Sequence, residues 1–287
     1  MIAARLRGLL HHEASTRSAG LLRIALASLA LALHGGELQL FRTLDVVSLT
    51  LGLAFHFFSL AMLVGVGSRL ATAGTGVVLV ACHHHFGVSL GRPTFTQHQG
   101  WLLASSVLLL ALTPCGASYS VDRARAVLRA ARAGRPAPDE RGDVSGLRLI
   151  ALQLSVVYLY GALHKTQLGF LSGARLQHIL LERYWGSDRP EGAWFAAAAL
   201  VASVSVVALE YVLSFGLWHP RLRGWLVAAG AGMHAAFHLL LPVGVFSALA
   251  VTLYLAFLPP GSVHRFLDLV HGGAPRAPRC RLSSARE

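Results

Sequence analysis

The sequence contains a single lysine, Lys165, among its 25 lysine and arginine residues. Arginine keeps its proton in nearly any environment, whereas a buried lysine can lose its proton and then act as a general base. Lys165 follows His164 at the end of an apolar stretch, so the two side chains could take up and pass on a proton. The alternative is a lysine whose ammonium group reaches the headgroup region of a membrane. Residue type alone leaves both interpretations open.

Histidines form the second group of residues that could do chemistry. His234 and His238 are four residues apart, so they share one helix face and could bind one ligand or relay a proton. The consecutive histidines at 83, 84 and 85 point about 100° apart on a helix and cannot all serve one site. A single histidine on an apolar face usually hydrogen-bonds a nearby carbonyl instead. Imidazole suits several transition metals, but no histidine–glutamate motif accompanies these residues, and we expect no metal.

The elements that must position these residues are long apolar segments. The chain is 54% hydrophobic and 13% charged, with a mean hydropathy of +0.57, whereas soluble chains are about 25% charged. A bilayer core needs roughly 20 apolar residues per helix. Proline breaks a helix, so we divide the longest run near Pro242. The sequence predicts an all-α polytopic membrane helix bundle of about eight spans (seven to nine): 19–35, 45–66, 70–90, 99–115, 147–162, 195–218 and two within 224–258.

Arginines gather on one side of this predicted topology, which places both termini in the cytoplasm. The basic charge is therefore explained by topology, and nucleic acid is not expected as a partner. We expect a multi-pass protein of the plasma membrane with a cytoplasmic segment at 1–17, a transmembrane domain at 18–260 that includes a basic cytoplasmic loop at 116–146, and a cytoplasmic tail at 261–287. The arginines on this side are Arg5, Arg7, Arg17, Arg69, Arg123, Arg125, Arg129, Arg132, Arg135, Arg141, Arg148, Arg221, Arg223, Arg265, Arg276, Arg279, Arg281 and Arg286.

This orientation brings titratable groups from five helices to the extracytoplasmic level. Burying such groups in hydrocarbon costs several kcal/mol each, so they should face one another, a cavity or water. Glu210 is the one acid well inside a predicted span, and we place it towards the cytoplasmic half, paired with Arg221, Arg223 or Tyr211. The groups at the outer level are His34, His83, His84, His85, His98, His164, Lys165, His234 and His238.

Several motifs around Lys165 occur in a recognisable order. The stretch 158–173 has the sequence YLYGALHKTQLGFLSG, and it is preceded by GVGSR at 65–69, TQH at 96–98 and TPCGASYSVD at 113–122. Glu210, Arg221, His234 and the GVF of 244–246 follow it. In this order the motifs resemble the vitamin K-dependent γ-carboxylase-like family, also called the HTTM (horizontally transferred transmembrane) domain, over about residues 18–258.

The resemblance implies a lipid quinol, such as menaquinol or a vitamin K-like molecule, as cofactor. In the carboxylase, the lysine that matches Lys165 is the base that deprotonates vitamin K hydroquinone, and a histidine matching His98 has a supporting role. We therefore expect Lys165, His98 and His164 as catalytic residues, and Tyr160, His234 and His238 as quinol-binding residues. Expected partners are membrane lipids and a small-molecule or peptide substrate.

The chain departs from the family pattern in ways that make protein carboxylation doubtful. Gln97, Thr166 and Phe170 replace the family's asparagine, leucine and tryptophan, and the carboxylase's large extramembrane domain has no counterpart here. An oxidation, deprotonation or small-molecule carboxylation linked to a quinol and O2 fits better.

Two other classes of function stay open. The first is a membrane protein without catalysis, acting as an immunity factor, partner subunit or transporter, although a transporter usually shows paired broken helices. The second is a metal oxidase, which needs at least three histidines within about 2–2.2 Å of one metal ion.

Overall fold

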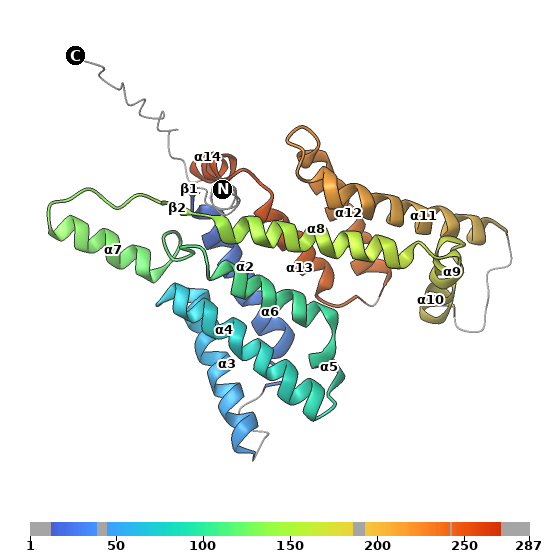
Figure 1. The fold of residues 1–287 in the computed structure, drawn as a ribbon, viewed down its shortest axis with the longest axis horizontal. Coiled ribbons are helices and arrows are strands. Elements are labelled where there is room, and N and C mark those ends of the chain that lie inside the picture. The colour runs from blue at the N-terminus through green and yellow to red at the C-terminus, as the bar shows by residue number, and fades with distance from the viewer. Residues whose placement is uncertain (1–12, 39–44, 186–192, 242, 271–287) are drawn as a thin grey trace, which may run out of the picture.

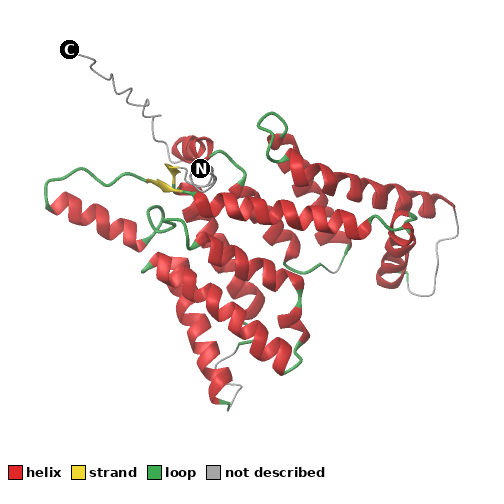
Figure 2. Ribbon diagram, in the orientation of Figure 1, coloured by secondary structure: helices red, strands yellow, loops and turns green. Residues whose placement is uncertain are grey.

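A computed structural model describes residues 13–38, 45–185, 193–241 and 243–270, which are almost entirely helical (Figures 1 and 2). The strands β1 (Glu13–Ser15) and β2 (Arg141–Asp143), which are far apart in the sequence, form a small two-stranded antiparallel sheet in which Glu13 pairs with Asp143. The helices are α2 (Arg17–His34), α3 (Val46–Val64), α4 (Ser68–Cys82), the π-helix η1 (His83–Ser89), α5 (Pro93–Thr96), α6 (His98–Leu110), α7 (Val121–Arg132), α8 (Ser145–Lys165), α9 (Leu168–Leu171), α10 (Ala174–Tyr184), α11 (Ala193–Gly216), α12 (Arg223–Leu240), α13 (Phe246–Leu253), the 3-10 helix η2 (Tyr254–Ala256) and α14 (Pro260–Val270).

Four helices of the described chain, α2, α3, α8 and α11, are long and apolar enough to cross a membrane. The pair formed by 246–256 and α14 would bring this number to five if it counted as one span, but the pair is bent by 103°. Large apolar side chains such as Phe57, Val201 and Phe215 are exposed on α3 and α11, as expected for surfaces that face lipid. The prediction of an all-α membrane protein is therefore confirmed.

The eight predicted spans all fall on helices, with α12 ending at Leu240 and α13 beginning at Phe246 around the predicted break. Pro242 itself lies outside the described residues. Because only four or five segments meet the length and apolarity that a span requires, the number of eight spans and the side of the termini stay predictions. The predicted loop at 116–146 contains α7 and β2, and α14 starts at the boundary predicted for the tail.

A fully buried arginine joins α2 to the end of α3 and to the segment that follows α6. Arg23 on α2 donates to the carbonyl oxygens of Met62 and Leu63 at the end of α3, of Cys115 at 3.2 Å and of Tyr119 at 2.6 Å. The last carbonyls of a helix have no partner within the helix, so Arg23 satisfies groups that would otherwise be buried without a donor. Next to it, Gly65 has φ +79°, and a Cβ there would lie 2.9 Å from Arg23 Nη1.

We predict that Arg23→Met destabilises the protein by on the order of 3 kcal/mol, because several buried carbonyls lose their donor at once. The measurement is thermal unfolding of the purified protein in detergent. Arg132→Met, at an exposed position of α7, is the matched control and should leave the melting temperature unchanged. A melting temperature for Arg23→Met equal to that of the control would contradict this role.

Candidate functional site

A cavity of about 830 Å³ lies where α8, α11 and α12 meet the start of α6. Its walls are mostly apolar, with a few polar side chains, which is the usual composition of a small-molecule site. It is lined by Gln97, His98, Gln99, Leu102, Val156, Val157, Tyr158, Tyr160, Gly161, Lys165, Phe170, Leu176, Ile179, Ser203, Val206, Glu210, Phe237, Leu241, Val243, Gly244 and Phe246.

Lys165 and Glu210 form an ion pair in the wall of this cavity. Lys165 Nζ lies 2.5 Å from Glu210 Oε1. Only 5% of Glu210 is exposed, and its second oxygen, Oε2, is buried with no hydrogen-bond partner among the described residues. A buried carboxylate oxygen without a donor is costly. Glu210 Oε2 is therefore the atom of the site that is best prepared to accept a hydrogen bond from a ligand.

The predicted partners of Glu210, which were Arg221, Arg223 or Tyr211, were wrong. Its partner is Lys165, while Tyr211 bonds Thr166 at 2.9 Å and Arg223 bonds the carbonyl oxygens of Leu217 and Trp218. The reason is the register of α8 against α11. Trp218 Nε1 donates to Ser155 Oγ at 2.8 Å, so α8 ends beside residue 211 rather than beside the start of α11. Lys165 therefore lies against the last third of the apolar helix α11 (Ala193–Gly216) and not against its start.

Three aromatic polar side chains make a buried cluster behind the cavity wall. Tyr158 lines the cavity, and its hydroxyl lies 2.8 Å from His234 Nε2 and 2.5 Å from the hydroxyl of Tyr254. His234 Nδ1 has no partner among the described residues. Gly230 makes room for this cluster, because a Cβ there would lie 2.0 Å from the Tyr254 hydroxyl. His234 is thus connected to the cavity through Tyr158 without lining it.

The structure brings together some of the predicted site residues and separates others. Lys165, His98 and Tyr160 line one cavity, and His234 lies one hydrogen bond behind it. His164 and His238 have exposed side chains outside this cavity, and the His164 ring stacks on Tyr160 with 6.2 Å between centroids.

The remaining histidines lie elsewhere. His34 stacks on Phe95, and His85 bonds Ser48. Within the described residues, no three His, Cys, Asp or Glu side chains come close enough to hold a metal ion.

The sequence-based prediction missed Tyr158, Tyr254 and the position of Glu210 in the cavity wall beside Lys165. Glu210 carried a visible signal, because an acid inside an apolar span needs a partner. The two tyrosines carried none, since a tyrosine in an apolar helix is equally suited to a membrane interface.

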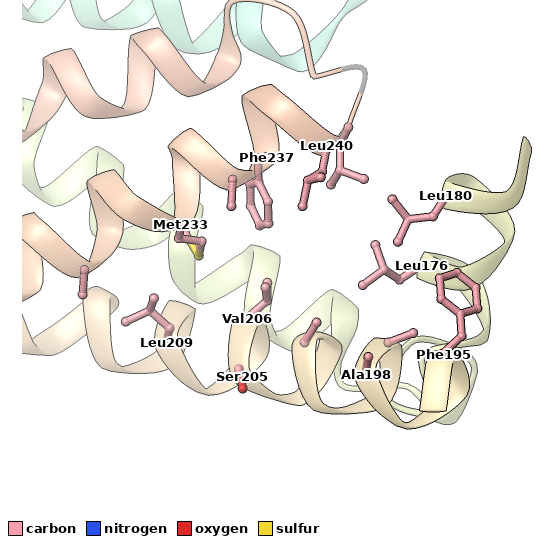
Figure 3. A pocket seen from close by; sticks show the side chains of 15 residues that line it. Leu176, Leu180, Phe195, Ala198, Ser205, Val206, Leu209, Met233, Phe237 and Leu240 are labelled. Carbon is pink, nitrogen blue, oxygen red and sulfur yellow. The ribbon is translucent and has the colours of Figure 1, made fainter. Parts of the chain in front are cut away.

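A second, almost wholly apolar chamber of about 440 Å³ adjoins the cavity (Figure 3). It lies between α10, α11 and α12, and Figure 3 shows Phe237, Leu176 and Val206 pointing into it. These three residues and Leu241 line both spaces. The arrangement therefore suits a ligand that has a small polar head and an apolar chain.

The two partners of the ion pair should differ in how much stability their loss costs. Lys165→Met leaves a buried carboxylate alone, whereas Glu210→Gln leaves a lysine whose side chain is 29% exposed and can reach water. We expect Lys165→Met to destabilise the protein by roughly 2–4 kcal/mol and Glu210→Gln by less.

The double variant Lys165→Met/Glu210→Gln should recover part of this loss, because it removes both charges. Thermal unfolding of the four proteins in detergent forms a double-mutant cycle that measures the coupling. Additive losses would show that the two side chains do not interact.

Comparison with known proteins supports one family. The chain matches the HTTM domain over residues 37–261, which is 225 of its 287 residues. No curated protein and no solved structure matches it. The matched region contains α3 to α13, and thus every residue of both cavities. The chain belongs to the HTTM domain family of membrane proteins.

Proposed function

We propose that this protein is an integral enzyme of the plasma membrane, related to the vitamin K-dependent carboxylases, that acts with a lipid quinol and O2. The observation that carries the proposal is the Lys165–Glu210 pair in the wall of a mostly apolar cavity. A charged pair kept in such a place is costly, and ionisable residues inside membrane helices usually mark functional sites.

The residues present fit a quinol. A quinol ring carries hydroxyl groups that donate hydrogen bonds, and Glu210 Oε2 is a buried acceptor without a donor. The adjoining chamber has the apolar lining that a prenyl chain needs. His98 and Tyr160 line the same cavity and would hold the ring. When bound, the quinol would supply reducing electrons and acidic hydroxyl protons.

Lys165 Nζ is the proposed base. Transfer of one proton from Lys165 Nζ to Glu210 Oε1 converts the ion pair into a neutral amine and a neutral acid. The neutral amine has a lone pair and can accept a proton from a ligand hydroxyl. Glu210 keeps the proton that it received from Lys165, and the new ammonium group balances the negative charge that would be left on the ligand oxygen. Lys165 Nζ and Glu210 Oε1 are in hydrogen-bond contact, as this transfer requires.

The finer topology is part of the same proposal. Eight spans with both termini in the cytoplasm place the carboxyl end of α8, and with it Lys165, on the extracytoplasmic side of Ser145. Support comes from the arginines of α7, which lie at the opposite end, beyond the start of α8 (Figure 1).

The test is oxygen uptake by the purified protein in nanodiscs supplied with menaquinol. We expect Lys165→Ala to lower the rate by about 100-fold or more, as loss of a general base does. Lys165→Arg should be equally inactive, because arginine keeps its proton. His219→Ala, in the exposed turn after α11, is the control and should keep the wild-type rate. Equal rates in all four proteins would exclude a base, and menaquinone binding without oxygen uptake would favour a non-catalytic binding protein.

The chamber predicts a dependence on the length of the quinol chain. Ala202 lines the chamber, so Ala202→Phe should fill it and weaken binding of long-chain menaquinone by about tenfold while sparing a short-chain analogue. Ala197→Phe places the same side chain on α11 outside either cavity and should have no effect. Binding is measured by quenching of the intrinsic tryptophan fluorescence. Equal weakening for both quinones would argue against a chain site.

A further inference from the structure

The last described helix, α14, lies across the direction of the long helices. Its axis is bent by 103° from the preceding helical segment at 246–256, across a break of no more than four residues. Figure 1 shows α14 nearly end-on, whereas α8 and α11 run along the plane of the view. It lies near the start of α8, next to the two-stranded sheet of β1 and β2 (Figure 1).

One face of α14 is fixed to the body of the protein. His264 Nδ1 lies 2.9 Å from Ser15 Oγ, and Asp268 Oδ1 accepts a hydrogen bond from Arg17 Nη1 at 2.5 Å. Arg17 also donates to the His264 carbonyl oxygen and to Glu140. Because Arg17 is the first residue of α2, these contacts set both the height of α14 and its rotation about its own axis.

The opposite face exposes large apolar side chains. Phe266, Leu269 and Val270 are 64%, 66% and 65% exposed, and Arg265 beside them is exposed as well. Positions 265, 266 and 269 share a face at helical spacing. A face with three large apolar groups and a cation is typical of a helix that lies in a membrane interface.

We propose that this outer face of α14 is an interfacial anchor that binds the surface of an anionic bilayer. Its apolar side chains would enter the boundary between headgroups and acyl chains, and Arg265 would contact lipid phosphates. The location supports a bilayer over another partner, because α14 directly follows an apolar helix and packs on the first turn of α2, itself a candidate span. Both neighbours would enter the membrane at the level of α14.

The charge of this end of the chain also favours an anionic surface. Beyond α14 the sequence contains Arg276, Arg279 and Arg281. Basic residues next to an interfacial helix strengthen its binding to anionic lipid. Binding of α14 to a bilayer does not require catalytic activity at the cavity.

The experiment places an environment-sensitive NBD fluorophore on Leu269→Cys in a Cys280→Ser background, since Cys82 and Cys115 are buried. The protein is reconstituted into phosphatidylcholine–phosphatidylglycerol vesicles with doxyl groups at carbon 5 or carbon 12 of the lipid. We expect blue-shifted emission that the carbon-5 probe quenches more strongly than the carbon-12 probe. NBD on Arg132→Cys, an exposed position of α7, is the control and should show the emission of a label in water.

Two results would overturn the proposal. If NBD on Leu269→Cys shows the emission of a label in water and is quenched by iodide, this face of α14 is exposed to solvent. If the emission is blue-shifted but neither doxyl lipid quenches it, and two Leu269→Cys copies cross-link, a second copy of the chain covers this face of α14. The charge contribution is tested separately. Arg265→Gln should lower the dependence of carbon-5 quenching on the fraction of phosphatidylglycerol, and an unchanged dependence would remove the anionic lipid from the proposal.

Discussion

The arrangement of the helices around the cavity depends on the pairing of Lys165 with Glu210. A glutamate buried inside an apolar helix needs a partner for its charge, because it has no water to take that place, and Lys165 is that partner. This pairing requires that α8 end against the last third of α11, and the hydrogen bonds between Tyr211 and Thr166 and from Trp218 to Ser155 keep the same register. The part of α11 that extends past α8 is contacted by α9 and α10. Phe170 of α9 lines the larger cavity, and Leu176 of α10 lines both spaces.

Away from the cavity, Arg23 is a second buried cation that holds helices together. Arg23 takes the carbonyl oxygens at the end of α3 and of the segment after α6 into one set of hydrogen bonds. Asp122 provides the complementary contact by accepting from the backbone of Gly67 and Ser68 at the start of α4. Helix ends in an apolar surrounding are thus satisfied by side chains rather than by solvent, and the turn between α3 and α4 is held from both directions.

The apolar segments could be read from the sequence because their length is dictated by the bilayer, and Lys165 could be singled out because it is the only lysine. The pairing of Glu210 with Lys165 could not be predicted, because the depth of each residue was assigned on the assumption that consecutive spans begin at the same level. An offset between α8 and α11 changes depth without changing hydropathy, so no composition signal reports it. Tyr158 and Tyr254 escaped for another reason. Their bond depends on a contact between residues 96 positions apart, which no local pattern encodes. The contact between α14 and the body of the protein likewise depends on Arg17, which lies 251 positions before Asp268 in the sequence.

The contact between Gly230 and Tyr254 has a consequence for how sequences with this fold can diverge. The tyrosine hydroxyl occupies the volume that a side chain at position 230 would need. Substitution at either position is therefore conditional on the other: a larger residue at 230 is admissible only after the residue at 254 has become smaller. Such a shortened residue would also withdraw the hydroxyl partner of Tyr158. Among relatives, a tyrosine at 254 should therefore occur only with glycine at 230, and a larger residue at 230 marks relatives that have lost the buried cluster.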